Sequence, residues 1–428
     1  MELLLGILLI VTFIIMVLLM MKGVNATFVL TIGAIVWALI GGRNFRQILD
    51  ITFGEIISRN ALTFMVICGG AWYSQMVVQT GIASSLIRKA VELGGDRPRI
   101  VVSLLMLVVS FLFITLFGVG PAIAIGVIVL PIMMTMGVDP KIASVAMMLP
   151  IAVATGVNIS QYHAVAPLID AGATFGSPYF PYAAIAYGFA LVIAIISVNI
   201  MLSRNKPVKA WAAKTDNFGE QKHVPWYAFL TLVIPVILIV IFKISVFVSF
   251  VIAIAYTALA TIDWKNKDWK HFNLIIKTSK DGFSDAAPVV LFIASTWLFA
   301  DSARLVNPLI INMVGGVLPT TRLGVCILFA VIAPLVMYRG PACYAGAGIA
   351  LYNGLIGMGI LPPSFIFTVG YSMETVHYQL DPTVSVVAWI TGYTGIKASD
   401  YVKTALVTVW VIAAVYMALV FIFVNPLA

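Results

Sequence analysis

The sequence predicts an all-α polytopic membrane protein made of two inverted repeats, each with about five transmembrane helices, one re-entrant hairpin and broken helices at the site. Three observations predict this fold class. Hydrophobic residues make up 62% of the 428 residues and charged residues only 10%, a balance that a soluble domain does not have. Apolar stretches of crossing length recur along the chain. Two of them are interrupted by the same triplet, Gly120-Pro121-Ala122 and Gly340-Pro341-Ala342.

Ten apolar segments are candidate membrane spans, judged against the roughly 20 residues that a helix needs to cross a bilayer. The first has Glu2 in place of the basic start of a signal peptide and no clear cleavage site, so we expect a retained helix. The stretches 100–136 and 323–358 each contain one triplet and are either two crossings or one re-entrant hairpin. In order, the ten spans are residues 3–20, 27–42, 61–80, 142–157, 181–203, 225–242, 244–262, 286–304, 364–376 and 403–425.

The distribution of lysine and arginine favours hairpins, because cytoplasmic loops carry an excess of these residues. With two hairpins and both chain termini outside, 18 of the 25 basic residues fall on the inner side; the loop from Arg43 to Arg59 is the one poor fit. Residues 1–203 and 225–428 are then inverted repeats in the cytoplasmic (inner) membrane, joined by a cytoplasmic linker, 204–224. The net charge of +8 follows this topology, so nucleic acid is not an expected partner.

The two hairpin tips are the first candidate site. Proline supplies no N–H and glycine tolerates positive φ, so the chain can turn sharply there. A helix that starts after such a turn presents free N–H groups and a positive dipole end to an anion. The alternative is a pair of helix kinks that serve packing. The predicted substrate-binding residues at the tips are Gly118, Val119, Gly120, Pro121, Ala122, Arg339, Gly340, Pro341 and Ala342.

A polar interruption follows each hairpin, at residues 154–163 and 371–379, and each ends in a histidine. Unwound carbonyls and side-chain oxygens suit Na⁺, whereas histidine and glutamate can relay protons. Alternatively, His163 and His377 lie at the water interface and are inert. Asn158 and the two histidines are further substrate-binding candidates. The predicted cation-coupling residues are Gly156, Asn158, Ser160, Ser372, Glu374 and Thr375.

Arg339 and Glu374 are the ionisable residues expected deepest in the membrane, where a charge costs roughly 2.5–3.5 kcal/mol on insertion scales and is usually paired or functional. Arg339 can hold a carboxylate through two parallel hydrogen bonds, or it can pair with Glu374 as a structural bridge. Cys68, Cys326 and Cys343 are scattered in apolar segments, which indicates neither a disulfide framework nor a zinc site.

The order of several short motifs resembles the ion-transporter superfamily, which includes carriers of anaerobic C4-dicarboxylates, citrate and gluconate, and divalent-anion:sodium symporters. These motifs are Gly69-Gly70, Thr80-Gly81-Ile82, Gly94-Gly95-Asp96-Arg97-Pro98, Leu116 to Ala122, and Leu130-Pro131. The resemblance implies a homodimer of inverted repeats in which a transport domain moves across the membrane like an elevator.

The hairpin tips depart from the sodium-coupled branch of this superfamily, whose tips carry a Ser-Asn-Thr signature. This chain has Val119-Gly120-Pro121 and Arg339-Gly340-Pro341 at those positions. Backbone N–H groups, Arg339 and the segments around Asn158 and Glu374 would have to replace the missing side-chain ligands.

These observations predict a secondary active transporter of a small organic anion, a mono- or dicarboxylate, coupled to Na⁺ or H⁺ by an elevator mechanism in the lipid bilayer. The alternative is a Na⁺/H⁺ antiporter of the same superfamily without an organic substrate. No clustered catalytic or metal-binding motif is found, so we expect no enzyme activity, no cofactor and no metal other than Na⁺. The sequence leaves open which anion, which cation, which direction of transport and whether an accessory protein is needed.

Overall fold

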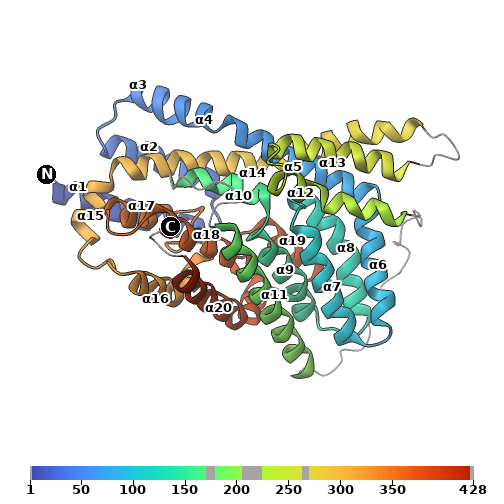
Figure 1. Cartoon of the computed structure of the whole chain (residues 1–428). Helices are drawn as coiled ribbons and strands as arrows, with labels where there is room; N and C mark the ends of the chain where they lie inside the picture. Colours follow the sequence, from blue (N-terminus) through green and yellow to red (C-terminus); the bar gives the residue numbers. More distant parts are fainter. Residues whose placement is uncertain (1, 170–178, 205–223, 263–268, 425–428) are drawn as a thin grey trace.

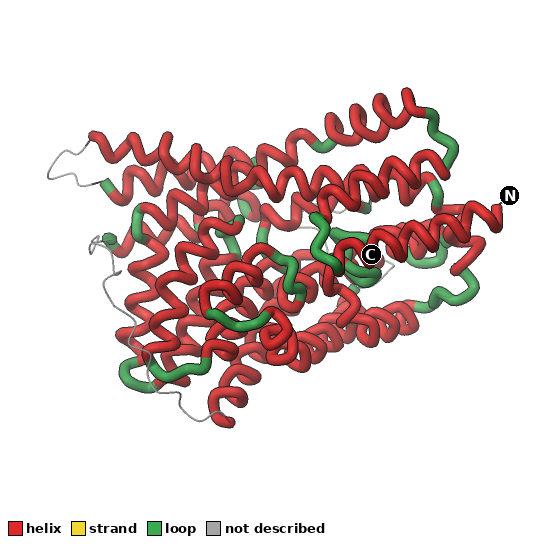
Figure 2. The backbone as a smooth tube through the Cα atoms, turned by 180° about the vertical axis from the view of Figure 1, so that it is seen from behind, coloured by secondary structure: helices red, strands yellow, loops and turns green. Residues whose placement is uncertain are grey.

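The structure is a computed structural model that describes residues 2–169, 179–204, 224–262 and 269–424. Every regular element in these ranges is helical, as Figure 2 shows, which confirms the all-α prediction. Six of the described helices are long and apolar enough to cross a membrane, and one bent helix pair makes a seventh if it is a single span. Most of the expected linker falls on residues 205–223, outside the described ranges.

The helices of the first half follow the predicted spans closely. They are α1 (Glu2–Met21), α2 (Ala26–Ile40), α3 (Phe45–Gln47), the π-helical η1 (Ile48–Glu55), α4 (Ile56–Arg59), α5 (Ala61–Gln79), α6 (Ile82–Gly94), α7 (Pro98–Phe113), α8 (Val119–Thr135), α9 (Pro140–Thr155), α10 (Ile159–Val165), the 3-10 turn η2 (Ala166–Leu168) and α11 (Tyr179–Arg204).

The second half repeats the order of long and short helices. Its elements are the 3-10 segment η3 (Trp226–Leu232), α12 (Ile234–Val240), α13 (Val246–Thr261), η4 (Trp269–Phe272), α14 (Asn273–Leu305), α15 (Asn307–Val314), α16 (Arg322–Ile332), the 3-10 segment η5 (Ala333–Arg339), α17 (Ile349–Gly357), α18 (Pro363–Leu380), α19 (Ser385–Thr394) and α20 (Ala398–Phe423).

Four predicted elements differ from the structure. The loop predicted from Arg43 to Arg59 is helical from Phe45 to Arg59, in α3, η1 and α4. The span 225–242 is divided between η3 and α12, where Pro235 lies in the first turn of α12 because it cannot donate a helical hydrogen bond. Helix α14 begins at Asn273, so Lys277 and Lys280, expected in a loop, lie on its first turns. The interruption expected at 371–379 is continuous helix, and α18 ends only at Leu380.

The helices form two bodies that lie against each other (Figure 1). In the first, α14 packs along both α2 and α5, and α13 packs on α5. The α5–α14 contact is very close, because a Cβ added at Gly282 would lie 2.5 Å from the Trp72 Cα atom. In the second body, α9 contacts α7, α8, α11 and α18, and α20 contacts α11, α16 and α18.

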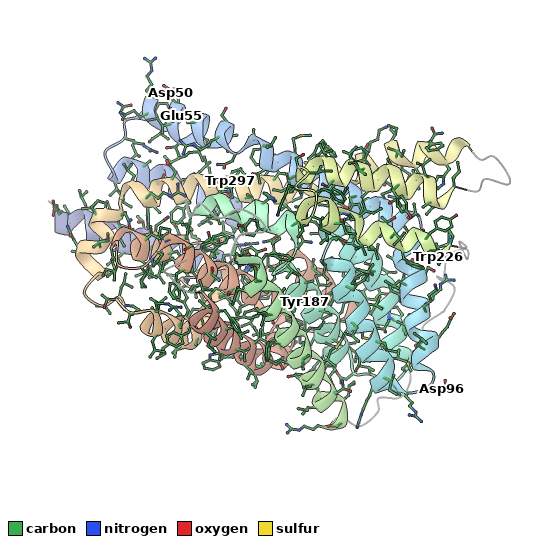
Figure 3. All side chains as sticks on the ribbon, in the orientation of Figure 1. Asp50, Glu55, Asp96, Tyr187, Trp226 and Trp297 are labelled. Carbon is green, nitrogen blue, oxygen red and sulfur yellow. The ribbon has the colours of Figure 1, made fainter. Side chains whose placement is uncertain are left out.

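Many large apolar side chains are exposed on the outer helix faces, and a smaller set of polar side chains is buried within a largely apolar interior. Val407 of α20 is 70% exposed, whereas Glu374 on α18 is only 2% exposed. Figure 3 shows Trp297 within the body of the protein, with Asp50 and Glu55 near one end and Asp96 at the opposite end. Exposed apolar helix faces around buried polar groups are what a lipid environment requires.

The first hairpin consists of α7, the tip at residues 114–118, and α8. At about 1.5 Å per residue, α7 and α8 are roughly 24–26 Å long, short of the approximately 30 Å hydrocarbon core. Their tip is buried rather than exposed, with Leu116 at 1% exposure and Phe117 at 7%. Both features favour a re-entrant hairpin over two full crossings.

Candidate functional site

The first hairpin tip turns at Gly118, whose φ of +108° is open to glycine but strained for other residues. Helix α8 begins at the next residue, Val119, so Gly120, Pro121 and Ala122 form its first turn. A break and a helix start are present at this tip, but the non-helical residues are 114–118, and the triplet predicted as the break lies inside the helix. Pro121 is tolerated here because the first-turn N–H groups have no intrahelical acceptor.

A carboxylate of the protein itself lies at this helix start. A Cβ added at Gly120 would be 1.8 Å from Asp285 Oδ2 of α14 and 2.7 Å from Gln75 Nε2 of α5. Gln75 Nε2 donates to the same Asp285 oxygen at 2.5 Å. The positive end of the α8 dipole favours this carboxylate. The first tip was predicted to offer the start of a helix to a substrate anion. In the structure the Asp285 carboxylate lies at that helix start.

We expect Gly120→Ala to push the first tip away from α14, because its methyl group would overlap Asp285. Melting temperature should fall by a few degrees, whereas Gly188→Ala should be neutral, since nothing lies within 4 Å of the Gly188 position. Asp285→Ala should restore much of the loss in the double variant, because neighbouring substitutions are not additive. A double variant whose loss equals the sum of the two single losses would contradict the contact.

The second hairpin has a different tip. Tyr338 and Arg339 adopt left-handed backbone conformations, with φ of 55° and 52°. No helix follows at once: residues 340–348, here called the hairpin loop, precede α17 at Ile349. The prediction of a helix start just after Gly340-Pro341-Ala342 is therefore wrong. The loop is wholly buried from Ala342 to Ala345, so protein groups must satisfy its backbone.

Arg339 is held at the mouth of this loop. Its backbone N donates to Asp381 Oδ2 at 2.9 Å, and its Nη1 donates to the Ala345 carbonyl at 3.3 Å. Its guanidinium lies 3.7 Å from the ring centroid of Phe292 on α14, a cation–π contact. Among the described residues no ion pair joins Arg339 to Glu374, so the structural-bridge alternative is not observed.

Both tips meet the same face of α14. Asp285 faces the first tip and Phe292 faces the second. The two residues are seven apart, which is two helical turns and about 10 Å along the axis. Two segments from opposite halves of the sequence therefore contact the same helix.

The first polar interruption is a real break. Helices α9 and α10 are bent by 66° around residues 156–158. The Tyr371 hydroxyl donates to the Thr155 carbonyl at 2.8 Å, and the Tyr179 hydroxyl donates to the Gly156 carbonyl at 2.9 Å. These two carbonyls freed by the break are thus satisfied by tyrosines of α18 and α11, as a membrane interior requires.

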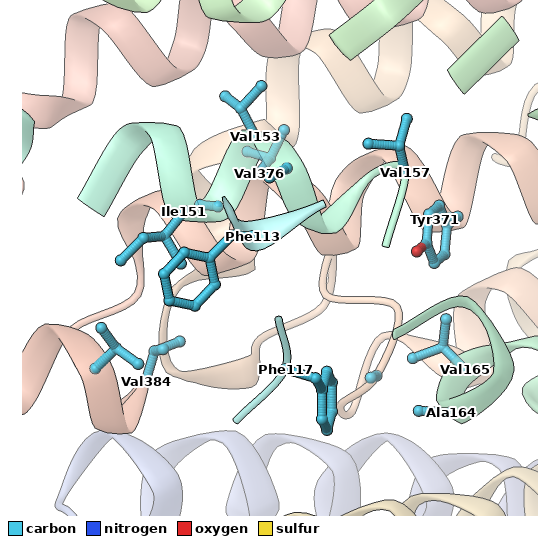
Figure 4. Close-up of a cluster of buried hydrophobic side chains, with 14 of the residues drawn as sticks. Phe113, Phe117, Ile151, Val153, Val157, Ala164, Val165, Tyr371, Val376 and Val384 are labelled. Atoms are coloured by element: carbon cyan, nitrogen blue, oxygen red, sulfur yellow. The ribbon is translucent and has the colours of Figure 1, made fainter. Parts of the chain in front are cut away.

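Asn158 joins this break to the first tip. Its Nδ2 donates to the carbonyls of Phe113 and Leu116, at 3.0 and 2.8 Å, while its Oδ1 accepts from the Gln161 N–H at 3.0 Å. Figure 4 shows Phe113 and Phe117 of the hairpin within the same cluster of buried side chains as Val157 of the break. Asn158 therefore binds backbone groups of the protein, and both of its amide hydrogens are used.

We expect Asn158→Ala to destabilise the protein strongly, because two buried carbonyls lose their donor at roughly 1–3 kcal/mol each. Asn158→Asp should be nearly as harmful, since the carboxylate retains the acceptor but not the donors. Asn199→Ala is the matched control: Asn199 also donates twice, but it is only partly buried. Thermal unfolding in detergent measures the difference, and equal melting temperatures for the two alanine variants would contradict this role.

Only some predicted cation-coupling residues come together. Gly156, Ser372 and Thr375 line a cavity of about 10 Å³, with Tyr182 and Tyr416 among its other walls. That volume suits one small ion or water. Ser160 instead packs on α5, where a Cβ added at Gly70 would lie 2.2 Å from its Oγ.

Glu374 belongs to a second polar face of α18, together with His377 and Asp381. Glu374 Oε2 accepts from the Ala345 N–H of the hairpin loop at 2.8 Å, and His377 Nε2 lies 2.9 Å from Asp381 Oδ2. His377 is 0% exposed, so the alternative that it lies at the water interface is wrong.

His163 is half-buried on α10, with its ring edge-on to Tyr162.

Asp381 and Asp285 were missed by the sequence analysis. Asp381 lies four residues after His377, a spacing that places both on one helix face, and this signal could have been read. Asp285 lies one residue outside a predicted span and carries no such signal. Only the packing of α14 beside α8 shows that Asp285 contacts the first tip.

The described helices of crossing length, with polar groups buried between them, define a multi-pass helical membrane protein. No family model and no curated protein sequence matches the chain. Among solved structures the fold is similar to the crystal structure of the YdaH transporter of Alcanivorax borkumensis, reported to have an unusual topology. The TM-score is 0.67 at 10% sequence identity, over 95% of this chain and 100% of that chain.

Proposed function

We propose that this protein is a secondary active transporter that moves a small organic anion, a mono- or dicarboxylate, across the inner membrane, coupled to Na⁺ or H⁺. The observation that carries the proposal is Arg339, presented at a broken hairpin against the same face of α14 that the first tip meets. Arg339 is half-buried, and among the described residues its guanidinium forms no ion pair, so its side chain can take an anionic ligand.

Arg339 is suited to a carboxylate. Among the described hydrogen bonds its guanidinium makes one, to the Ala345 carbonyl, out of five possible donors. The remaining donors can form the two parallel hydrogen bonds that guanidinium and carboxylate groups favour. The Phe292 ring covers one face of the guanidinium and orients it. A second carboxylate of a dicarboxylate would extend away from the hairpin loop.

The small cavity lined by Gly156, Ser372 and Thr375 is the proposed site of the coupling cation, because its lining includes hydroxyl groups next to a helix break. Helix α18 links the two sites. Ser372 and Thr375 face this cavity, while Glu374 on another face accepts from the Ala345 N–H beside Arg339. A cation that shifts α18 would therefore alter the loop that holds Arg339.

The proposal includes an elevator motion of the second body against the layer formed by α2, α5, α13 and α14 (Figure 1). Residues 1–203 and 225–428 would be inverted repeats joined by 204–224, with both termini outside and two protomers in a homodimer. Support comes from element order: the sequence of helices from α5 to α11 recurs from α14 to α20. The bent pair α9–α10 and the consecutive helices α18 and α19 occupy matching places in that order.

Uptake by proteoliposomes tests the proposal. Radiolabelled mono- and dicarboxylates should accumulate under an inward Na⁺ gradient or an inward proton gradient, and only slightly without either. Sodium-driven proton movement in the absence of any organic anion would instead favour the antiporter. A purified, folded protein that moves none of these ions under any gradient would refute both.

A further inference from the structure

Three metal-ligating side chains meet where the hairpin loop contacts α18. Cys343 comes from the loop, and Glu374 and His377 come from α18. Cys343 Sγ lies 3.7 Å from Glu374 Oε2, and His377 Nδ1 lies 3.6 Å from Glu374 Oε1. One ligand atom from each residue can be chosen so that all three lie within 4.8 Å of one another. We propose that these residues bind one thiophilic divalent transition-metal ion, Zn²⁺ being the reference case.

The spacing agrees with a tetrahedral ion. Bond lengths of about 2.3 Å to sulfur and 2.0–2.2 Å to nitrogen or oxygen place neighbouring ligand atoms roughly 3.3–3.6 Å apart. The two observed separations are close to this range, although they run to different oxygens of Glu374, and all three ligand atoms lie within 4.8 Å of one another, so an ion would draw them closer together. A set of one thiolate, one imidazole and one carboxylate is selective for zinc-like metals over Na⁺, Mg²⁺ or Ca²⁺.

His377 is oriented for this role. Its Nε2 lies 2.9 Å from Asp381 Oδ2, so we assign the ring hydrogen to Nε2. Nδ1 then carries a lone pair and faces Glu374 Oε1 at 3.6 Å, and neither ring nitrogen of this wholly buried side chain makes a hydrogen bond of good geometry among the described residues. A histidine that contacts a carboxylate through one nitrogen and a metal through the other is the usual arrangement in metal sites.

The charges also balance when the ion is present. The half-buried Arg339, the buried Glu374 and Asp381, and a neutral His377 sum to one negative charge, and leaving a buried carboxylate uncompensated is costly. A divalent cation together with the Cys343 thiolate adds one positive charge and makes the cluster neutral. The expectation from sequence that no zinc site exists was drawn from cysteine spacing alone, and the fold supplies the histidine and glutamate that spacing could not show.

Metal binding can be measured without any transport assay, so this inference does not depend on the proposed function. Chelator-treated, tag-free protein in detergent is kept reduced and incubated overnight with Co²⁺, because the site is buried. A thiolate-to-cobalt charge-transfer absorption and one Zn²⁺-displaceable cobalt ion per protomer are expected. Zn²⁺ content after desalting, measured by mass spectrometry, gives an independent stoichiometry.

Variants assign the ligands. Cys343→Ser should abolish the charge-transfer band and weaken zinc binding at least about tenfold, while Cys326→Ser, which changes a buried cysteine near Arg322, should leave both unchanged. Asp381→Asn should retain the band but weaken binding about 10- to 100-fold, as expected for a residue that positions a ligand. Thermal melts without metal confirm folding of each variant.

Two results would overturn the inference. In the first, the wild-type protein takes up no more cobalt or zinc than the Cys343→Ser variant. A proton on His377, and not a metal ion, would then neutralise the negative charge of the cluster. Alternatively, Cys343→Ser and His377→Gln could both bind with wild-type affinity and spectrum, which would place the metal elsewhere.

Discussion

Arg339→Ala is expected to reduce uptake of the organic anion to background in proteoliposomes while the protein remains folded. The substitution removes the guanidinium held at the hairpin loop. The contact of this guanidinium with the Phe292 ring and its one hydrogen bond to the Ala345 carbonyl contribute little to the stability of the fold. The backbone bond from Arg339 N to Asp381 survives, because it does not involve the side chain. The loss should therefore appear in transport and not in the melting temperature.

Two further variants separate charge from geometry in this experiment. Arg339→Lys retains the positive charge but not the two-pronged contact, so partial uptake with weaker apparent affinity is expected. Arg46→Ala changes an exposed arginine whose side chain is 91% accessible, and it should transport normally. Wild-type uptake by Arg339→Ala would remove Arg339 from the proposed substrate site.

Gly348→Ala should prevent the hairpin loop from forming. A Cβ at this position would lie 2.3 Å from the Cys343 carbonyl oxygen, 2.6 Å from the Pro341 carbonyl oxygen and 2.9 Å from the Cys343 N. These are backbone atoms, which cannot rotate away as a side chain can. Because the loop is wholly buried, the cost should be roughly 3 kcal/mol or more.

The matched control is Gly392→Ala in α19, because nothing lies within 4 Å of the added methyl group there. Size-exclusion chromatography and thermal unfolding should show aggregated or strongly destabilised protein for Gly348→Ala and near-normal behaviour for Gly392→Ala. If Gly348→Ala had the melting temperature of the wild type, the close backbone packing of the loop would be wrong.

Much of the helical layout could be predicted from the sequence, since each apolar span and each break is a local property. The span predicted at 61–80 is α5, and the break predicted at Gly120-Pro121-Ala122 lies at the start of α8. The prediction from local sequence was wrong where a helix continues through polar residues. Residues 371–379 carry Glu374 and His377 yet remain helical, because tertiary packing buries both side chains and the Ala345 N–H donates to Glu374.

The candidate site could be predicted only in part. Arg339 and Glu374 were singled out because a charge in an apolar segment is unusual, and both lie at the second hairpin. Their partners were not foreseen: Asp381 binds the Arg339 backbone, and the Ala345 N–H binds Glu374. Cys343 was set aside from sequence spacing, yet it lies 3.7 Å from Glu374.

The sequence by itself determined a membrane protein in which two apolar stretches are interrupted. Hydrophobicity and the conformational limits of glycine and proline act over a few residues, so a local pattern can reveal them. Only the tertiary structure decided which groups meet. Asp285 reaches the first tip and Phe292 the second because α14 runs past both. Such contacts depend on how segments far apart in the chain pack and rotate against one another, and no local pattern in the chain specifies that rotation.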